Sequence, residues 1–503
     1  MNTWWRDAVV YQIYVRSFAS TGETGMGDLR GITSRLPYLA DLGVDAVWLT
    51  PFYPSPQHDH GYDVANYTDV DPRFGTLTDF DEMLRTAHEL GLKVIVDVVP
   101  NHTSIEHPWF RAALAAGKGS PERARYLFRD EPNNWLSVFG GSAWTQVEDG
   151  QHYLHLFDFT QPDLDWTNPE IGDFFESVLR FWLDRGVDGF RVDVAHGNRK
   201  QAGLPDAEDP VGSQAGAVRG PMWDQPEVHE IYRRWHQVLA QYPGDRMAVA
   251  EAWAATPERT MAYARPDELQ QAFNFHWLEA SWDAIAFRAV IEETLASCDL
   301  VGASPTWVLS NHDVVRHPTR YGGGAIGLAR ARAATLLMLA LPGSAYLYQG
   351  EELGLEQVDV PEAQRQDPQF LHGRDVGRDG CRVPIPWSGV APPFGNGRGA
   401  PWLPQPEGWR DLTVEVQAID PDSTLSYYRR MLAMRRRLDA DAVTLLAASP
   451  RVVGFRRGRV TALLNAGDRS VPLPDGEVLL ASGPLGDGLP PDTAVWVQDT
   501  ASL

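Results

Sequence analysis

The chain has 503 residues and a formal net charge of −23, which is enough length for one large domain and one or two smaller ones. This acidic balance argues against nucleic acids and anionic membranes as partners, because both would require a basic patch. No apolar run approaches the roughly 18 residues of a membrane span, and the start, MNTWWRDAVVYQ, lacks the pattern of a signal peptide. Two cysteines, Cys298 and Cys381, offer no disulfide framework or zinc site. We therefore expect a cytoplasmic protein.

Strands and helices alternate over the first hundred residues. We predict strands at 9–18, 45–50 and 93–99, and helices at 32–41 and 78–90, the second helix capped by Thr78. The third strand, KVIVDVV, is apolar throughout, which is typical of a buried parallel sheet. This alternation indicates βαβ units and an α/β domain.

The alternation is interrupted between residues 102 and 165. This stretch is rich in Gly, Pro, Asn and aromatic residues, and it is too long for a loop without structure of its own. We predict a small inserted domain at 102–165, after the third strand.

The alternation resumes at residue 166. We predict helices at 169–184, 227–240, 277–297 and 325–341, and strands at 189–193, 246–251, 271–275, 306–310 and 344–349. Eight strands with intervening helices predict an α/β fold, a (β/α)8 barrel built from residues 1–101 and 166–438. A long loop at 354–421 precedes the last helix, at 423–438. Short alternating runs then predict a small antiparallel β domain at 439–503.

The segment GFRVDVAHG carries Arg191 and Asp193 two residues apart, so both side chains leave one face of a strand. A neighbouring guanidinium lowers the pKa of a carboxyl group and keeps it ionised. An ionised carboxylate at a strand end is the nucleophile of a covalent glycosidase mechanism. The alternative is an internal ion pair on a barrel strand.

Other predicted strand ends also carry polar groups: Asp97 with His102 (DVVPNH), Glu251 (AVAEAW), and His312 with Asp313 (VLSNHD). In such a barrel, catalytic groups lie at the carboxyl ends of the strands. Carboxylates from three strands at one mouth are hard to explain structurally, because unpaired buried carboxylates cost several kcal/mol.

These groups divide the chemistry between them. Asp193 is the expected nucleophile, and the apolar context of Glu251 would raise its pKa, as a general acid requires. Asp313 would accept hydrogen bonds from the sugar hydroxyls. His102 and His312 would be neutral donors to a bound ring.

DVVPNH, GFRVDVAHG, AEAW and VLSNHD resemble, in this order, the four signature regions of the α-amylase superfamily, glycoside hydrolase family 13. QPDLDW, at 161–166, is similar to the region that marks its α-glucosidase and oligo-1,6-glucosidase branch. The resemblance covers the chain from about residue 4 to its end. It implies a retaining double displacement, with the nucleophile, the acid/base and the transition-state stabiliser at Asp193, Glu251 and Asp313.

Two further segments suggest an exo-acting enzyme. QHDHGYD resembles a family segment that implies Asp59 and Tyr62 at the innermost sugar site. RDGCRVPIPW resembles the loop after the eighth strand and supplies Arg382. The resemblance implies that Asp59 and Arg382 close the pocket on a terminal glucose; the alternative is a surface salt bridge. His60 stands where relatives often have Asn.

The loop after the first predicted strand bears on metal binding. The loop STGETGMGDL retains only Asp28 where many relatives supply several calcium ligands, so we predict no metal there, and no cofactor.

The residue after the expected nucleophile bears on the bond that is cleaved. In relatives, Val at the position of Val194 tends to accompany cleavage of α-1,6 bonds, whereas the following AHG resembles the sequence of enzymes that act on maltose-like sugars. The loop at 198–221 could line the acceptor side or cover the barrel rim.

The leading hypothesis is a cytoplasmic α-glucosidase that releases glucose from the non-reducing end of short α-glucosides. One alternative is a sucrose or trehalose isomerase, or a transglucosylase, in which a sugar instead of water accepts the glucosyl group. A second alternative is a non-enzymatic partner subunit, which would usually lack part of the carboxylate triad. The sequence leaves the oligomeric state open.

Overall fold

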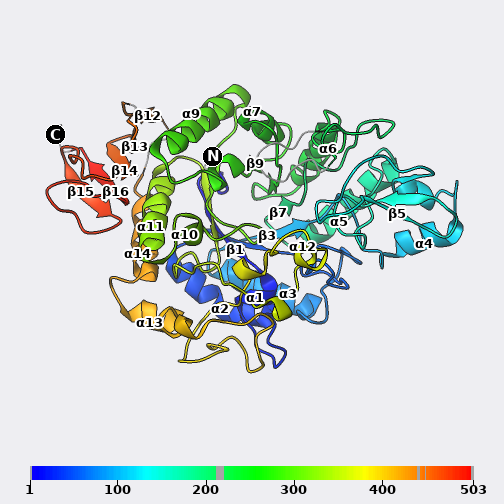
Figure 1. Ribbon diagram of the computed structural model, residues 1–503, viewed down its shortest axis with the longest axis horizontal. Coiled ribbons are helices and arrows are strands. Elements are labelled where there is room, and N and C mark those ends of the chain that lie inside the picture. The colour runs from blue at the N-terminus through cyan, green and yellow to red at the C-terminus, as the bar shows by residue number, and fades with distance from the viewer. Residues whose placement is uncertain (1–2, 211–219, 439–441, 448, 500–503) are drawn as a thin grey trace.

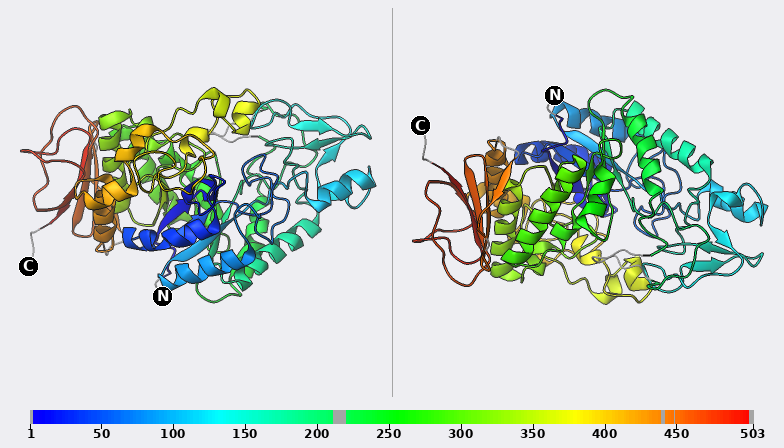
Figure 2. Two further views of the ribbon diagram at one scale, coloured as in Figure 1. Left: turned by 90° about the horizontal axis from the view of Figure 1, so that it is seen from below. Right: turned by 90° about the horizontal axis from the view of Figure 1, so that it is seen from above.

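The computed structural model describes residues 3–210, 220–438, 442–447 and 449–499. A central barrel lies between a C-terminal sheet at one end and the segment between β3 and α5 at the other (Figure 1). Both views of Figure 2 keep this order along the long axis. In these residues, no helix combines the length and the apolar character needed to cross a membrane.

The core is a parallel eight-stranded sheet with the strand order β10-β11-β1-β2-β3-β7-β8-β9. Its strands are β1 (Val9–Ile13), β2 (Ala46–Leu49), β3 (Lys93–Val98), β7 (Gly189–Val192), β8 (Met247–Ala250), β9 (Gln271–Ala272), β10 (Thr306–Val308) and β11 (Ser344–Tyr348). The sheet curls into a nearly closed barrel, so the predicted (β/α)8 fold is confirmed. Strand residues are buried on both faces, which explains their continuous apolar runs.

The main helices follow the strands in chain order. They are α2 (Leu29–Leu42), α3 (Leu77–Glu89), α5 (Pro169–Asp184), α6 (Val228–Leu239), α9 (Ala284–Val301) and α11 (Gly324–Ala340). Helix α3 begins after Thr76, not Thr78 as predicted: Thr76 accepts a hydrogen bond from the Asp79 backbone, and the Asp79 side chain accepts one from the Thr76 backbone. Such a capping box satisfies two helix-end donors at once.

Three predicted elements are wrong in extent. The strand predicted at 271–275 is the two-residue β9, and Phe275 is already helical. The strand predicted at 9–18 ends at Ile13, and Val15–Phe18 forms the short helix α1. The helix predicted at 277–297 is two helices, α8 (Phe275–Leu278) and α9, with the Asp283 carboxylate capping α9. Short apolar runs do not distinguish strand from helix by periodicity alone, which explains the error at 9–18.

The segment between β3 and α5 has its own small structure. Helix α4 (Pro108–Ala116) precedes a three-stranded antiparallel sheet of β4 (Phe128–Arg129), β5 (Trp144–Gln146) and β6 (His152–Leu154). Its apolar core also includes Val194 and Trp223 from the barrel side. The insertion therefore packs directly against the segment that follows β7.

The C-terminal sheet is antiparallel, with the order β12-β13-β14-β16-β15, as predicted. Its strands are β12 (Val443–Leu445), β13 (Val452–Arg457), β14 (Val460–Asn465), β15 (Glu477–Ala481) and β16 (Thr493–Gln498). The Trp496 indole donates to the Leu336 carbonyl of α11 over 3.0 Å. The sheet is therefore docked on the outside of the barrel, away from the insertion.

The remaining helices lie mostly in the connections. They are α7 (Pro257–Met261), α10 (His317–Arg320), α12 (Pro368–Leu371), α13 (Val414–Ile419) and α14 (Thr424–Arg435). The long loop predicted at 354–421 thus contains two short α-helices and three short 3-10 helices, and its segment at 378–382 reaches the barrel mouth.

Candidate active site

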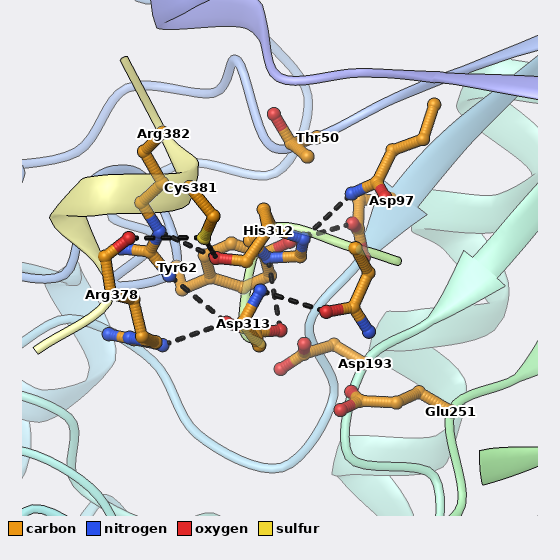
Figure 3. Close-up of polar contacts among 12 residues, drawn as sticks. Thr50, Tyr62, Asp97, Asp193, Glu251, His312, Asp313, Arg378, Cys381 and Arg382 are labelled. Carbon is orange, nitrogen blue, oxygen red and sulfur yellow. Dashed lines mark hydrogen bonds and ion pairs between the residues drawn. The ribbon is translucent and has the colours of Figure 1, made fainter. Parts of the chain in front are cut away.

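The three predicted catalytic carboxylates meet at the carboxyl ends of the barrel strands. Asp193 directly follows β7, Glu251 directly follows β8, and Asp313 lies five residues beyond β10. Figure 3 shows their side chains turned toward one shared space. The side chains of Asp193, Glu251 and Asp313 are 7%, 12% and 25% exposed, so Asp313 is the most accessible of the three.

Arg191, on β7, is the cation that organises this group. Its Nη1 lies 2.9 Å from Asp97 Oδ1 and 2.5 Å from Asp193 Oδ1, and its Nη2 lies 2.8 Å from Glu251 Oε2. One buried guanidinium thus contacts three carboxylates. Because their repulsion is only partly compensated, the cluster favours keeping a proton among them.

The electrostatics differ from the sequence-based expectation in two respects. Burial raises the pKa of Asp193 well above its ordinary value although Arg191 lowers it, because Arg191 is shared with Glu251 and Asp97. Burial likewise raises the pKa of Asp97 to about 7. The expected lowering of the Asp193 pKa is therefore wrong. The expected apolar surroundings of Glu251 are also wrong, since its carboxylate accepts bonds from Arg191, the Val194 backbone and the Trp253 indole.

Asp313 lies in a cationic setting. Arg378 Nη1 and Arg382 Nη2 each approach its Oδ1 to 3.0 Å, and His312 Nε2 lies 3.3 Å from its Oδ2. Burial opposes ionisation, but His312 and the two guanidinium groups outweigh it and hold the pKa of Asp313 below its ordinary range. Asp313 is therefore an anion that faces the shared space.

His312 is fixed as a neutral donor. The Gln12 amide donates to its Nδ1 over 2.7 Å, which leaves the hydrogen on Nε2, the atom near Asp313. Its ring stacks on Tyr62 with centroids 5.3 Å apart and planes 6° apart. Burial holds the pKa of His312 well below its ordinary value. Gln12, on β1, was missed in the sequence because no motif marks it.

Asp59 pairs with Arg378 and not with Arg382. Arg378 Nη2 lies 2.8 Å from Asp59 Oδ1, and the Gln161 amide donates to Asp59 Oδ2 over 3.1 Å. Arg382 instead binds Asp313 and Asp367. Asp59 and Arg382 are thus not in direct contact, and their joint closure of the pocket on a terminal glucose stays a prediction; the motif RDGCRVPIPW contains both arginines. The surface salt bridge is also excluded, since Asp59 is 4% exposed.

His102 lies deeper in the site. The Asn101 amide nitrogen lies 3.1 Å from its Nδ1, and its Nε2 lies 3.2 Å from the Tyr62 carbonyl and 3.1 Å from the Gln161 amide nitrogen. Burial lowers the pKa of His102 to about 4. The Tyr62 hydroxyl donates to Asp97 Oδ2 over 3.2 Å. His102 and Tyr62 therefore join the signature residues into one connected network.

Val194, directly after Asp193, has the unusual backbone φ of 44°. A β-branched residue pays a steric cost in this left-handed region. The conformation turns the Val194 N–H toward Glu251 Oε2, at 2.9 Å. The backbone strain thus accompanies a direct contact between the two strand ends that carry Asp193 and Glu251.

The start of the 198–221 loop is tied to the insertion. Lys200 Nζ lies 2.7 Å from Asp163 Oδ2, and Arg199 donates to the Trp166 carbonyl over 2.6 Å. Both partners belong to the QPDLDW motif. Residues 211–219 of this loop lie outside the described residues, so its role toward an acceptor stays a hypothesis.

One buried group among the described residues has the composition of a metal site, with ligand atoms within 4.8 Å of one another: His60, Asp367 and Asp379. Arg378 and Arg382 already bind Asp367 Oδ2 at 2.7 and 3.1 Å, and Arg16 donates to His60 Nδ1 over 3.0 Å. Three guanidinium groups around these ligands do not fit a cation, so we assign none.

In the loop STGETGMGDL, at 20–29, the Asp28 side chain caps α2. Its Oδ1 accepts the Gly31 N–H over 2.6 Å and its Oδ2 accepts the Thr21 N–H over 2.8 Å. The absence of calcium from this loop stays a prediction.

Comparisons with known proteins agree with this geometry. The family model for "Alpha amylase, catalytic domain" matches residues 12–442. An oligo-1,6-glucosidase of Parageobacillus thermoglucosidasius is 36% identical over 478 residues, covering 87% of this chain and 84% of that protein. A probable α-glucosidase of Rhizobium meliloti is 38% identical over 508 residues, covering 93% and 90%. The crystal structure of the α-glucosyl transfer enzyme XgtA superposes with a TM-score of 0.91 at 36% identity, covering 99% of this chain and 100% of that one.

A (β/α)8 barrel with three carboxylates and a shared arginine at its mouth defines a glycoside hydrolase. The chain belongs to the α-amylase family, glycoside hydrolase family 13, in its α-glucosidase and oligo-1,6-glucosidase branch. It is an enzyme, so the alternative of a non-enzymatic partner subunit is wrong.

Proposed function

We propose that this enzyme is a retaining, exo-acting α-glucosidase that hydrolyses terminal α-linked glucose from short α-glucosides. The observation that carries the proposal is the shared contact of Arg191 with Asp193 and Glu251. It holds a carboxylate nucleophile beside an acid/base at two neighbouring strand ends. Asp313 lies across the same space.

The reaction has two steps. In the first, Asp193 attacks the anomeric carbon while Glu251 gives its proton to the glycosidic oxygen, and the bond from the anomeric carbon to that oxygen breaks. In the second, Glu251 takes a proton from water as this water attacks the anomeric carbon and displaces Asp193. Two inversions retain the α configuration. Asp313 would accept bonds from the sugar hydroxyls as the ring flattens.

The exo mode is supported by the buried pair of Asp59 and Arg378. Charged groups that converge in this way suit the hydroxyls of a chain-terminating glucose. We propose that Tyr62, His102, His312, Arg191 and Arg382 complete the substrate-binding wall.

Transfer to a sugar acceptor is the second candidate, and one observation favours it. The α-glucosyl transfer enzyme matches 99% of this chain at 36% identity. Hydrolysis and transfer share the covalent intermediate and differ only in which acceptor reaches it.

The test is a proton NMR time course of the purified enzyme with maltose and, separately, with isomaltose. Early release of α-glucose from either sugar is expected, and the two rates give the linkage preference. New disaccharides or longer products without free glucose would overturn hydrolysis in favour of transfer. Early β-glucose would overturn the retaining mechanism.

A further inference from the structure

The two oxygens of Glu251 have different surroundings. Oε2 accepts two donors, the Val194 N–H at 2.9 Å and Arg191 Nη2 at 2.8 Å. Oε1 accepts one neutral donor, the Trp253 indole N–H at 3.1 Å. An oxygen whose two lone pairs accept hydrogen bonds from a guanidinium and an amide N–H has no lone pair left to carry a proton. The acid proton of Glu251 therefore belongs on Oε1.

We propose that Trp253 is a positioning residue that holds Glu251 Oε1 in place for proton transfer. This inference rests on the proposed function of Glu251 as acid/base. A hydrogen bond to a charged oxygen is about twice as strong as one to a neutral oxygen. The indole N–H therefore gains strength as Oε1 gives up its proton, and it favours the transition state over the ground state.

The Trp253 ring is itself held in place. It stacks on Phe275 with centroids 4.0 Å apart and planes 21° apart. Phe275 lies in turn against Phe273, 5.8 Å away, within an apolar cluster made largely of barrel-strand residues. Trp253 also contacts the apolar cluster of the insertion, so its side chain bridges the two. A donor supported in this way keeps its direction during turnover.

The test compares Trp253→Phe with a matched control, Trp282→Phe. Phenylalanine keeps an aromatic ring for the stack and removes only the N–H. Trp282 is also half-buried and also donates to a carboxylate, Asp492 Oδ1, at 2.9 Å, but it lies outside the site. The control therefore loses the same kind of bond elsewhere in the molecule.

For Trp253→Phe we expect kcat/KM for maltose to fall about tenfold, which is the range for a lost bond to a charged group. The fall with p-nitrophenyl α-glucoside is expected to be smaller, because its leaving group needs less protonation. The basic limb of the pH profile should move to higher pH, because the lost donor favoured the ionised form. Trp282→Phe should leave the limb in place.

The inference would be overturned if the basic limb of the pH profile stayed in place and kcat/KM fell equally for both substrates in Trp253→Phe. It would also be overturned if Trp282→Phe shifted the basic limb by the same amount. A second measurement needs no turnover: pH titration by infrared spectroscopy of the protonated carboxyl band that Glu251→Gln removes. In Trp253→Phe this band should persist to higher pH, and an unchanged titration would overturn the inference. A wild-type enzyme that releases no glucose would overturn the proposed function alone.

Discussion

Arg378 and Asp59 form a buried ion pair, with 2.8 Å between Nη2 and Oδ1, while the same guanidinium reaches Asp313 at 3.0 Å. Arg378 thus links the residue proposed to bind the terminal glucose to the residue proposed to stabilise the transition state. Arg378→Met would leave Asp59 buried without its cation, so kcat/KM for maltose is expected to fall about 100-fold or more. Steady-state kinetics with maltose measure this. The exposed Arg374→Met, on the same loop, is the control, and an Arg378 variant as active as this control would contradict the assignment.

The roles of the two catalytic carboxylates can be separated by azide. Asp193→Gly and Glu251→Ala should each lose at least about 10³-fold in kcat on maltose. With p-nitrophenyl α-glucoside and azide, Glu251→Ala should form α-glucosyl azide, because azide attacks the covalent intermediate without a general base. Asp193→Gly should form β-glucosyl azide, because azide then replaces the nucleophile. NMR of the products distinguishes the anomers, and the opposite pairing would reverse the two roles.

Val194 is expected to influence the choice of bond. Replacing it with Ala or Thr should raise the rate ratio of maltose to isomaltose by about tenfold, the scale of one methyl-sized contact. Both sugars are assayed with each variant. Val390→Ala, at a site 83% exposed, should leave the ratio unchanged. A ratio that stays constant in the Val194 variants would show that other residues set the linkage.

Glu351 should make stability depend on pH. Burial raises the pKa of Glu351 to about 8, against roughly 4.3 in an unfolded chain. Between these values the folded state holds the proton that the unfolded state has lost, so the free energy of unfolding falls as pH rises, by at most about 1.4 kcal/mol per pH unit. Glu351→Gln has no such proton. Its stability relative to wild type should therefore increase from pH 5.5 to pH 7.5.

Urea unfolding of both proteins at several pH values, followed by tryptophan fluorescence, measures this difference. Glu131→Gln, at an exposed position, is the control. A stability difference that is the same at every pH would show that Glu351 does not carry the effect.

Calcium should not stabilise this enzyme through the loop at 20–28. Of its two acidic side chains, Glu23 and Asp28, the latter is engaged by the Thr21 and Gly31 backbone as the cap of α2. We expect the same melting temperature in millimolar calcium and in excess chelator. A clear rise with calcium that Asp28→Asn abolishes would place an ion in this loop.

The barrel could be predicted from the sequence because its strands are continuous apolar runs and several of its helices, α3, α5 and α6 among them, have clear amphipathic periods. Residues that share a strand end, such as Arg191 and Asp193, could also be placed together, since the side-chain period of a strand fixes their common face. The helix break at Asp283 could not be foreseen, because Trp277 to Ser297 keeps an apolar pattern across it.

Contacts between distant loops were predicted less well. The ion pair of Asp59 with Arg378 could not be predicted, because spacing within a motif does not show which guanidinium a loop directs toward a given carboxylate. The ionisation of Asp193 was misjudged for a related reason. The motif places Asp193 beside Arg191 alone, whereas the fold adds Asp97 and Glu251 to the same cation.

The position of Arg191 between Asp193 and Glu251 has a consequence for the whole proposed cycle. In the first step of the proposed reaction Asp193 attacks as the anion while Glu251 holds the proton. In the glucosyl intermediate Asp193 is a neutral ester and Glu251 is the anion. Arg191 therefore faces one negative charge from this pair at both stages, and the net charge of a water-poor site stays constant. No counter-ion has to enter or leave between the two halves of the reaction.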